Sequence, residues 1–443
     1  MSFLSDKRRS LFLLLLFGLL LTGCRNGKNG FDRSAADALP HRCVDRLTRI
    51  IVHDIVSPPV ASRMYAYTIL ALYEALAPAD SSARPLLVRL RNFAPLPRSV
   101  SLSEQQCSLA ALESFCIVAR ALVFSKDSID RFRNEYSLQL SKGLPAAEAT
   151  AAREYGKAVA DVILQRASSD RYKLTRGLPR YSVFREEGKW LPTPPDYADA
   201  VEPYWGTIEP LIWDSAAACP PPPPPAYNIT DTGSSFYREL METYEAVKYS
   251  TPARDTIARF WDDNALVTEH NGHLVYAAKK PSPVGHWMGI TSIVTRKKGM
   301  PAVRSARTYA LVAASIFDGF IVCWHEKYRS RMVRPVTVIR EKIDPGWWPL
   351  LQTPPFPEYT SGHSVISAAA AEVLETIAGK GFAFTDTTEL EYLGWSRSFP
   401  SVRAAADEAG ISRLYGGIHY PSAILQGKEQ GRKTGERFAA LLE

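Results

Sequence analysis

Apolar residues recur at helical spacing along most of this 443-residue chain, and this periodicity constrains the fold more than any other feature. Apolar residues at positions i, i+3 and i+4 are typical of amphipathic helices. No series of alternating apolar and polar residues, the pattern that predicts a β-sheet, stands beside them. The sequence therefore predicts an all-α fold, a helical bundle with helices over 44–57, 61–77, 102–124, 128–140, 145–167, 235–248, 252–266, 284–298, 305–328, 362–379, 401–412 and 422–442.

The helical pattern is interrupted between residues 174 and 230, where proline, tryptophan and tyrosine accumulate and Pro220 to Pro225 form an unbroken run. Such a run favours an extended left-handed helix and cannot join a helix interior. We interpret the segment as a surface connection rather than a docking site for a proline-binding module. The chain is long enough for two domain-sized halves, and the predicted regions are 1–23, 24–230 and 231–443.

The first residues have the features of a bacterial export signal. A basic start, Lys7-Arg8-Arg9, precedes an apolar run from Leu11 to Leu21, and Leu21-Thr22-Gly23-Cys24 resembles a lipobox. Because about 20 apolar residues are needed to span a bilayer, a cleaved signal is favoured over a membrane anchor. The sequence predicts that Cys24 is lipidated and anchors the protein to a membrane. Since Arg25 follows and no acidic run is present, we predict an outer-membrane lipoprotein facing the periplasm or the cell surface.

Charge and cysteine content narrow the classes of ligand. The formal net charge is +7, and the charged residues are spread along the chain. This balance suits small anionic ligands and does not indicate nucleic-acid binding. The cysteines beyond Cys24 form no zinc-type cluster, and we expect buried free thiols.

Three short blocks in the C-terminal region contain the residue types that bind a tetrahedral oxyanion. Together they supply three cations, two histidines and a hydroxyl beside a glycine. Charge-assisted hydrogen bonds are the strong ones, and the arginine fork matches such an anion. Any one of these residues alone would be interpreted as a surface cation or a core histidine, but the ordered set predicts an anion site with acid–base chemistry. The blocks are Lys327 with Arg334-Pro335, then Ser361-Gly362-His363, then Ser412-Arg413 with His419.

The spacing inside the blocks predicts local structure. Seven residues are almost two helical turns, so Lys327 and Arg334 are expected on one face of a single helix that ends before Pro335. His363 is expected at the start of the apolar helix that follows it. The amides and the positive dipole at that helix start favour an anion, and Gly362 permits a close approach.

The three blocks resemble the signature of the superfamily that contains vanadate-dependent haloperoxidases and phosphatidic-acid-phosphatase-type acid phosphatases. Trp324 and Phe356 resemble the aromatic residues beside the halide site in the haloperoxidase branch. The likeness is tight over 324–419 and loose over most of the rest, including Arg63-Met64-Tyr65-Ala66-Tyr67, Phe260-Trp261-Asp262-Asp263 and Gly285-His286-Trp287. There is one departure: the family aspartate that follows the final histidine has no counterpart in Tyr420-Pro421-Ser422-Ala423.

The resemblance implies a vanadate-dependent haloperoxidase that oxidises halide with hydrogen peroxide to hypohalous acid, with 231–443 as its catalytic domain. It implies that His419 binds the vanadate metal, that His363 is the acid–base group and that Lys327 polarises the peroxide. The implied halide pocket contains Trp324 and Phe356. The implied cofactor-binding residues are Lys327, Arg334, Ser361, Gly362, His363, Arg413 and His419.

Two alternatives stay open at this point. Phosphate is nearly isosteric with vanadate, so the same site would suit an acid phosphatase in which His419 becomes a phospho-histidine and His363 protonates the leaving oxygen. Trp324, Phe356 and the large N-terminal half favour the peroxidase. The third alternative, a surface lipoprotein that binds an oxyanion without turnover, is supported by the missing aspartate.

Three further residues near these motifs carry weaker predictions. Asp262 or Asp263 is expected to pair with Lys327 or Arg334, and a helix-surface carboxylate is the equally weighted alternative. His286 is interpreted as a packing residue.

Overall fold

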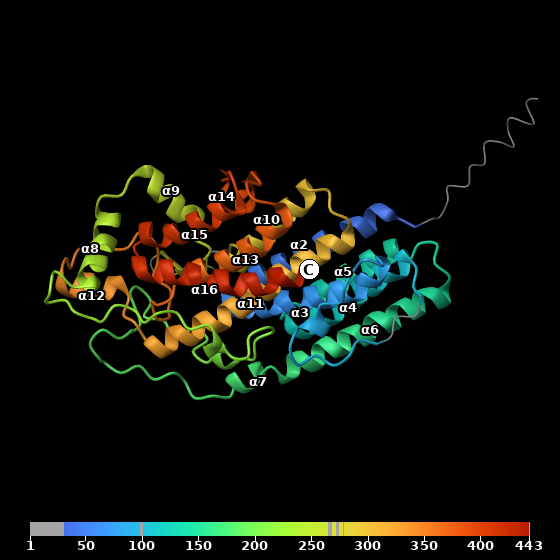
Figure 1. The fold of residues 1–443 in the computed structure, drawn as a ribbon, viewed down its shortest axis with the longest axis horizontal. Helices are drawn as coiled ribbons and strands as arrows, with labels where there is room; N and C mark the ends of the chain where they lie inside the picture. The colour runs from blue at the N-terminus through green and yellow to red at the C-terminus, as the bar shows by residue number, and fades with distance from the viewer. Residues whose placement is uncertain (1–30, 98–100, 265–267, 272–273, 278, 443) are drawn as a thin grey trace, which may run out of the picture.

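The computed structural model describes residues 31–442 except 98–100, 265–267, 272–273 and 278. The helices form one elongated body in which α8 and α12 lie at one end and α4, α5 and α6 at the other (Figure 1). The predicted all-α class is confirmed. The predicted signal 1–23 and Cys24 lie outside the described residues.

The helices fall into two groups along the chain, before and after the proline-rich connection. The first group comprises α2 (Arg33–His53), α3 (Pro58–Leu76), α4 (Glu104–Leu122), α5 (Lys126–Leu140), α6 (Ala146–Ser169) and the short α7 (Tyr172–Thr175). The second comprises α8 (Ser235–Lys248), α9 (Pro252–Phe260), α10 (Pro283–Lys297), α11 (Ala302–Ser330), α12 (Pro335–Lys342), α13 (Gly362–Ala378), α14 (Leu390–Leu393), α15 (Val402–Tyr415) and α16 (Pro421–Ala439).

Helix α11 is the centre of the body. It has 29 residues and packs against α3, α13 and α16. In the part of the chain that the structure describes, it is the helix whose length and composition would let it cross a membrane, yet 94% of its most apolar window is buried in the protein. Its apolar character is therefore explained by its place in the core.

One apolar core includes residues from both sides of residue 230. All 19 residues of α3 are buried, and its Leu70 belongs to the same cluster as Ile316 of α11 and Val365 of α13. The boundary at residue 230 stays a prediction. The shared core means that the N-terminal helices support the helices that carry the three sequence blocks.

Proline sets the start of several helices. The ring fixes a helical φ and removes an N–H that has no partner in the first turn, so proline is favoured there. It occupies this position in α3, α9, α10, α12 and α16. The prediction of one helix through Lys327 and Arg334 is wrong for this reason: Pro335 begins α12 with Arg334 as its cap, and α11 has already ended at Ser330.

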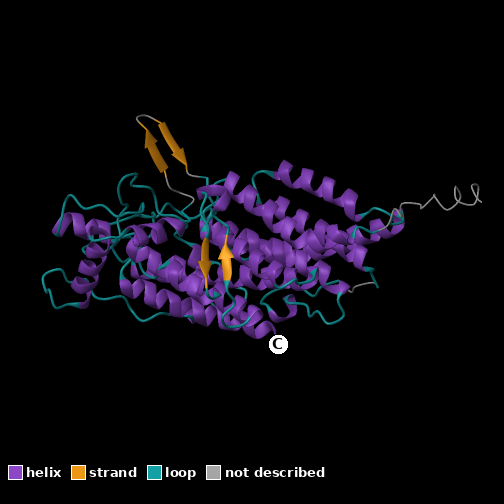
Figure 2. Ribbon diagram, turned by 90° about the horizontal axis from the view of Figure 1, so that it is seen from above, coloured by secondary structure: helices purple, strands orange, loops and turns teal. Residues whose placement is uncertain are grey.

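Four short strands interrupt the helices, which the sequence did not predict. Strands β1 (Thr268–Asn271) and β2 (Leu274–Ala277) form an antiparallel pair that stands away from the helical body (Figure 2). Strands β3 (Phe384–Asp386) and β4 (Arg397–Phe399) form a second antiparallel pair against the body. Strands this short give too little alternation to be recognised in a sequence.

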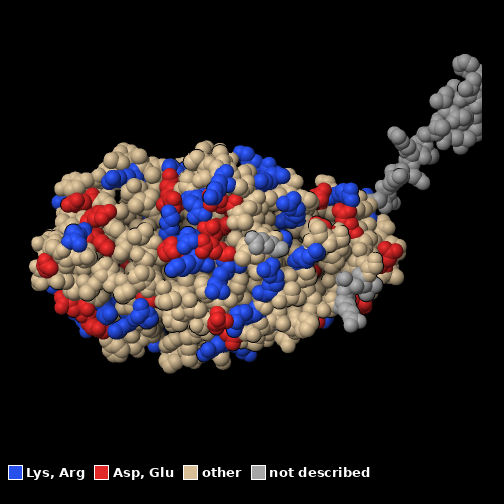
Figure 3. Space-filling model, in the orientation of Figure 1, with Lys and Arg blue, Asp and Glu red and all other residues tan. Residues whose placement is uncertain are grey.

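Positive and negative side chains are mixed on the surface, and on the face shown in Figure 3 lysine and arginine lie among aspartate and glutamate. Several of these charges pair, as Arg49 does with Glu391 and Arg403 with Glu372 and Glu375. The five described cysteines are buried free thiols, as expected: Cys43, Cys107, Cys116, Cys219 and Cys323.

Glycine allows α16 to lie against α13 with almost no space between the backbones. A Cβ atom at Gly431 would stand 2.0 Å from the carbonyl oxygen of Val365, and one at Gly427 would stand 2.8 Å from the carbonyl oxygen of Ser361. Ser361 caps α13, so this contact also fixes the helix start that carries His363.

We expect Gly431→Ala to destabilise the protein, because α16 and α13 must move apart to admit the methyl group. Overpacking of this kind typically costs about 1–3 kcal/mol. Thermal unfolding measures the effect, and Gly177→Ala is the matched control because its added Cβ would lie 3.8 Å from its nearest neighbour, an ordinary contact. Equal melting temperatures for the two variants would contradict the close approach.

Candidate active site

Residues of the second and third sequence blocks line one pocket, and Arg334 of the first block reaches it through His419, whose Nε2 lies 3.3 Å from Nη1 of Arg334. Lys327 lies in the last turn of α11, Arg334 caps α12, and Arg413 lies in the last turn of α15. Ser361 caps α13 and His363 lies in its first turn, while His419 lies between α15 and α16. The pocket lining includes Trp324, Phe356, Gly362, His363, Arg413 and His419.

Lys327 is fully buried, and backbone carbonyls hold its ammonium group. Its Nζ donates hydrogen bonds to the carbonyl oxygens of Pro357 at 3.0 Å and Glu358 at 2.9 Å. Burial, with the neighbouring Arg334, lowers the pKa of Lys327 to about 7. A bound anion would favour the charged form of this lysine.

Arg334 is also fully buried, and two carbonyls fix the plane of its guanidinium. Nε donates to the carbonyl oxygen of Phe356 at 2.9 Å and Nη1 to that of Ile418 at 2.7 Å. Its Nη2 is buried with no hydrogen-bond partner. An unpaired buried donor on a cation is costly, so Arg334 indicates that an acceptor belongs at this position.

The third cation, Arg413, is held by the end of α9. Its Nη2 donates to the carbonyl oxygens of Ala258 at 3.3 Å and Trp261 at 2.6 Å. Carbonyls in the last turn of a helix have no helical partner and carry the negative end of the dipole, so they attract a cation. α9 ends at Phe260, earlier than predicted, which leaves these carbonyls to Arg413 and places Asp263 in the following loop.

Ser361 uses its hydroxyl oxygen as an acceptor within α13. The oxygen accepts from the amide of Ser364 at 3.4 Å and from the Ser364 hydroxyl at 3.0 Å. Its own O–H is therefore still available to donate. At Gly362, an added Cβ would meet the ring of Trp324 at 3.5 Å, so this residue lies directly against the aromatic wall of the pocket.

His419 is held by a carboxylate that the sequence did not reveal. Its Nδ1 donates to Oε1 of Glu358 at 2.7 Å, and the amide of Tyr420 donates to the same oxygen at 2.9 Å. A proton on Nδ1 leaves the lone pair on Nε2, where Nη1 of Arg334 lies at 3.3 Å. Burial, followed by the cations Arg334 and Lys327, holds the pKa of His419 well below its usual value.

Glu358 thus supplies the carboxylate beside the final histidine, where the segment after His419 has no aspartate. Glu358 is fully buried, and burial raises its pKa to about 7 although Arg334 and Lys327 act in the opposite direction. It stands five residues before His363 in the chain, inside the Pro-Phe-Pro-Glu segment. The signal that could have identified it is an acidic residue beside a signature block, but no spacing rule connects it to His419.

We expect Glu358→Ala to weaken vanadate binding about 10–100-fold, the usual effect of removing a residue that orients a metal ligand. Without the carboxylate, His419 has no fixed tautomer and Nε2 is no longer presented to the pocket. Calorimetric titration with vanadate measures the affinity. Glu326→Ala is the matched control, because Glu326 is a buried carboxylate that pairs with Arg329 instead. Unchanged affinity in Glu358→Ala would contradict this role.

His363 lies in the first turn of α13 with 15% of its side chain exposed. Burial, together with Arg413, lowers the pKa of His363 to about 4, so the ring is neutral near pH 7 and can accept a proton. Its Nε2 is 3.7 Å from Oδ2 of Asp263 and has no hydrogen-bond partner.

The predicted pairing of Asp262 or Asp263 with Lys327 or Arg334 is wrong. Asp262 pairs with Lys280 at 2.7 Å. Asp263 accepts a hydrogen bond from His286 at 2.9 Å. The cause is the early end of α9, which places both aspartates in the following loop, where Lys280 and His286 are their partners.

Two aromatic rings form the apolar wall of the pocket. The ring centroids of Trp324 and Phe356 are 4.9 Å apart, and the Phe356 ring also lies 5.1 Å from both Lys327 Nζ and the Arg334 guanidinium carbon. The cavity is small, about 40 Å³. By the measure that one water molecule needs about 10–15 Å³, it has room for about three water molecules.

Three solved structures similar to this chain are those of bacterial vanadium-dependent haloperoxidases. A bacterial vanadium-dependent iodoperoxidase is 40% identical, with a TM-score of 0.83 over 91% of this chain and 97% of that chain. The holo form of a bacterial vanadium-dependent chloroperoxidase is 17% identical, with a TM-score of 0.66 over 88% of this chain and 93% of that chain, which shows the common fold. Residues 307–443 match the VCPO second helical-bundle domain. No curated protein matches the chain.

Proposed function

This chain belongs to the family of vanadium-dependent haloperoxidases, and from that we propose that it oxidises iodide with hydrogen peroxide. Peroxide is reduced to water and iodide is oxidised to hypoiodous acid, with one proton consumed. The choice of iodide is supported by the 40% identity to an iodoperoxidase. The single observation that carries the proposal is the group of buried cations beside His419, with Nη1 of Arg334 at 3.3 Å from Nε2 of that ring.

The donor set fits a vanadate ion. Nη2 of Arg334 is a buried donor that lacks an acceptor, and Ser361 retains a free O–H. The Nε2 lone pair of His419 is the ligand atom that a metal would take, because Glu358 fixes the proton on Nδ1. Bound vanadate supplies a Lewis acid that activates peroxide without a change of oxidation state.

The remaining chemistry belongs to side chains of this protein. We assign Lys327, Arg334 and Arg413 to binding the anion and balancing its charge. His363 accepts the proton that hydrogen peroxide loses as it binds, which requires the neutral ring that its low pKa provides. Lys327 polarises the peroxide oxygen. Trp324 and Phe356 exclude water from the side where the halide approaches, and charge interactions are stronger where water is absent.

A side-by-side assay tests the proposal. Protein loaded with vanadate is expected to oxidise iodide with hydrogen peroxide, and protein freed of vanadate is expected to lose this activity. The vanadate-free protein is expected to hydrolyse simple phosphate esters only slowly, since the small apolar cavity leaves little room for a leaving group. Rapid phosphatase turnover without vanadate-dependent iodide oxidation would refute the proposal and favour the acid phosphatase.

We also propose that Cys24 carries a lipid that anchors the protein to the outer membrane. The basic Lys7-Arg8-Arg9, the short apolar run and the lipobox-like Leu21-Thr22-Gly23-Cys24 support this. Mass spectrometry of the N-terminal peptide, with Cys24→Ser as the comparison, tests the modification. An unmodified Cys24 in membrane fractions, or equal membrane association of the variant, would refute it.

A further inference from the structure

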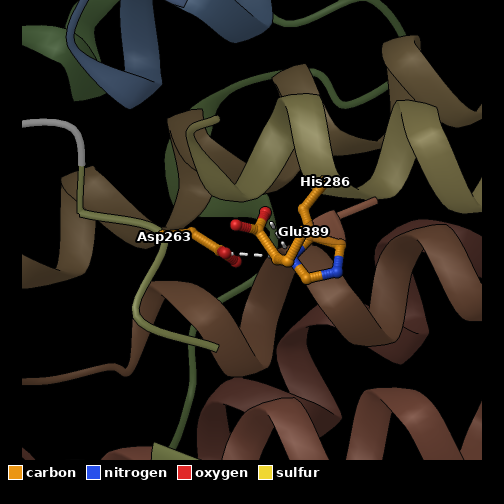
Figure 4. A group of neighbouring side chains, drawn as sticks. All are labelled: Asp263, His286 and Glu389. Atoms are coloured by element: carbon orange, nitrogen blue, oxygen red, sulfur yellow. Dashed lines mark hydrogen bonds and ion pairs between the residues drawn. The ribbon is translucent and has the colours of Figure 1, made fainter. Parts of the chain in front are cut away.

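A buried group of ionisable residues lies beside His363. It contains Asp263, His286, Asp386 and Glu389, which we call the His286 network. His286 comes from α10, Asp263 from the loop after α9, and Glu389 from the segment before α14; Figure 4 shows Asp263 and Glu389 pointing toward the His286 ring. All four residues are buried. The peroxidase chemistry described above uses none of them.

His286 is hydrogen bonded to a carboxylate through each ring nitrogen. Nδ1 lies 2.9 Å from Oδ1 of Asp263, and Nε2 lies 2.8 Å from Oδ2 of Asp386. A carboxylate only accepts, so two such bonds require a proton on both nitrogens. Trp261 stacks on the ring, with centroids 4.5 Å apart and planes 17° apart, and an indole face favours a cation. The geometry points to an imidazolium ion.

The electrostatics of the network agree with this geometry. Burial disfavours a charged ring, but Asp263 and Asp386 outweigh it and raise the pKa of His286 well above its usual value. Burial acts against the ionised form of Asp263 as well, and His286 nevertheless holds the pKa of Asp263 below its usual value. Burial raises the pKa of Glu389 to about 8, so this carboxyl is neutral near pH 7.

The same residues resemble a metal site, since ligand atoms of Asp263, His286 and Glu389 lie within 4.8 Å of one another. A histidine binds a metal through a lone pair on one ring nitrogen. In His286 both nitrogens are directed at carboxylates, and no lone pair is left for an ion. We therefore interpret the group as a charge network rather than a metal centre.

Asp263 connects this network to His363. Its Oδ1 accepts from His286, while its Oδ2 lies 3.7 Å from Nε2 of His363, the buried nitrogen without a hydrogen-bond partner. Catalytic hydrogen bonds are often long before the ligand binds and shorten afterwards. An ionised Asp263 can only accept from Nε2, which places the His363 proton on Nε2 and the lone pair on Nδ1.

We propose that His286 is a positioning residue for His363 and acts through Asp263. The imidazolium keeps Asp263 ionised in a buried place, and the ionised carboxylate fixes the tautomer and the orientation of the His363 ring. The proposal rests on the proposed role of His363 as the acid–base group. Asp386 holds the other nitrogen of His286, Nε2, and Glu389 lies 3.7 Å from Nδ1 as a further buried member of the network.

Removal of His286 has a defined expected result. Without the imidazolium, buried Asp263 takes up a proton, and its O–H then donates to Nε2 of His363. The His363 ring proton moves to Nδ1, and that nitrogen can no longer accept a proton. Asp263→Asn should give the same result, because an asparagine amide also donates. Asp263→Glu should restore part of the wild-type behaviour.

Nitrogen NMR of ¹⁵N-histidine-labelled, vanadate-free protein tests the proposal without any activity assay. In the wild type the His363 signal, identified by its loss in His363→Gln, should show a proton on Nε2. In His286→Gln the proton should be on Nδ1. Asp386→Asn, which keeps the shape of the site, should shift the tautomer in the same direction if His286→Gln fails to fold. His41→Gln is the control, since His41 is a buried histidine of α2 that is bonded to Tyr309 of α11.

Kinetics of the vanadate-loaded enzyme provide the second readout. His286→Gln should lower kcat roughly 10²-fold, the lower end of the effect of acid–base catalysis, with vanadate affinity within about threefold of the wild type. In a His363→Ala background the same substitution should have almost no further effect, because residues that act as a unit are not additive. If His286 had only a structural role, its loss would instead lower both kcat and the affinity for vanadate.

Specific results overturn the proposal. One is a His363 proton that stays on Nε2 in both His286→Gln and Asp386→Asn. Another is a loss of kcat that is additive when His286→Gln is combined with His363→Ala. One equivalent of a divalent cation in the purified protein, bound by the network, would also overturn it. If the wild type proved unable to oxidise halide, the NMR result would still decide the link between His286 and His363, so the two failures can be told apart.

Discussion

Replacing His419 with alanine should abolish tight vanadate retention and, with it, vanadate-dependent iodide oxidation. His419 offers the one nitrogen lone pair that Glu358 presents to the pocket, so the substitution removes the bond to the metal and leaves only ionic contacts with the cations. Dialysis of loaded protein followed by metal analysis measures retention. The expected ratio of bound vanadium to protein falls from near one to near zero.

A buried histidine outside the pocket provides the control for this variant. His41→Ala removes a similar side chain from α2 and should leave vanadium retention unchanged. Retention of vanadium by the His419 variant at the wild-type level would show that another residue binds the metal, and the assignment of the ligand would be wrong.

Replacing His363 with alanine should lower turnover without releasing vanadate. The variant should retain vanadate, because the three cations and His419 stay in place, and should lose turnover by roughly 10²–10⁴-fold, the usual contribution of a general acid–base group. Steady-state rates of iodide oxidation at saturating vanadate measure the loss. The rate should fall in kcat more than in the KM for iodide, since His363 is assigned to the proton of peroxide.

The comparison of the two histidine variants is decisive. Equal loss of vanadate in both would mean that the roles assigned to His363 and His419 are wrong. Full retention of turnover in His363→Ala would mean that a different group accepts the proton.

The sequence predicted those parts of the fold and site that depend on local pattern. Helical periodicity identified the helices around α11 and α13, and Ser361-Gly362-His363 was correctly placed at a helix start. Residues of the second and third blocks line one pocket, and Arg334 of the first block contacts His419. These predictions succeed because helix periodicity, capping and motif spacing are encoded within a few residues of one another.

The break between helices α11 and α12, which separates Lys327 from Arg334, shows where local reasoning was misleading. A seven-residue interval suits one helix face, but it also suits a helix that ends and a second that starts. Arg331 adopts a left-handed conformation (φ 52°) and Pro335 begins α12, so two cations from different helices reach one pocket. Proline is compatible with either interpretation, and the tertiary structure decides between them.

Glu358 and His286 could not have been predicted, because their partners lie far away in the sequence. The bond from His419 to Glu358 joins residues 61 positions apart, and the bond from His286 to Asp386 joins residues 100 apart. The missing aspartate after His419 suggested an unsupported histidine. The structure corrects this, since a carboxylate oxygen reaches the same nitrogen from another loop.

The way the cations are held has a consequence for the stability of the protein. Among the described residues, the hydrogen bonds of Lys327 and Arg334 go to carbonyl oxygens and to His419, and carbonyls carry only partial charge. Like charges therefore stand together in the anion-free protein. A ligand that binds only the folded chain adds RT ln(1 + [L]/Kd), about 2.7 kcal/mol at a hundredfold excess over Kd. Vanadate and phosphate should both raise the melting temperature. Phosphate in the medium should therefore compete with vanadate for the anion site formed by Lys327, Arg334 and Arg413.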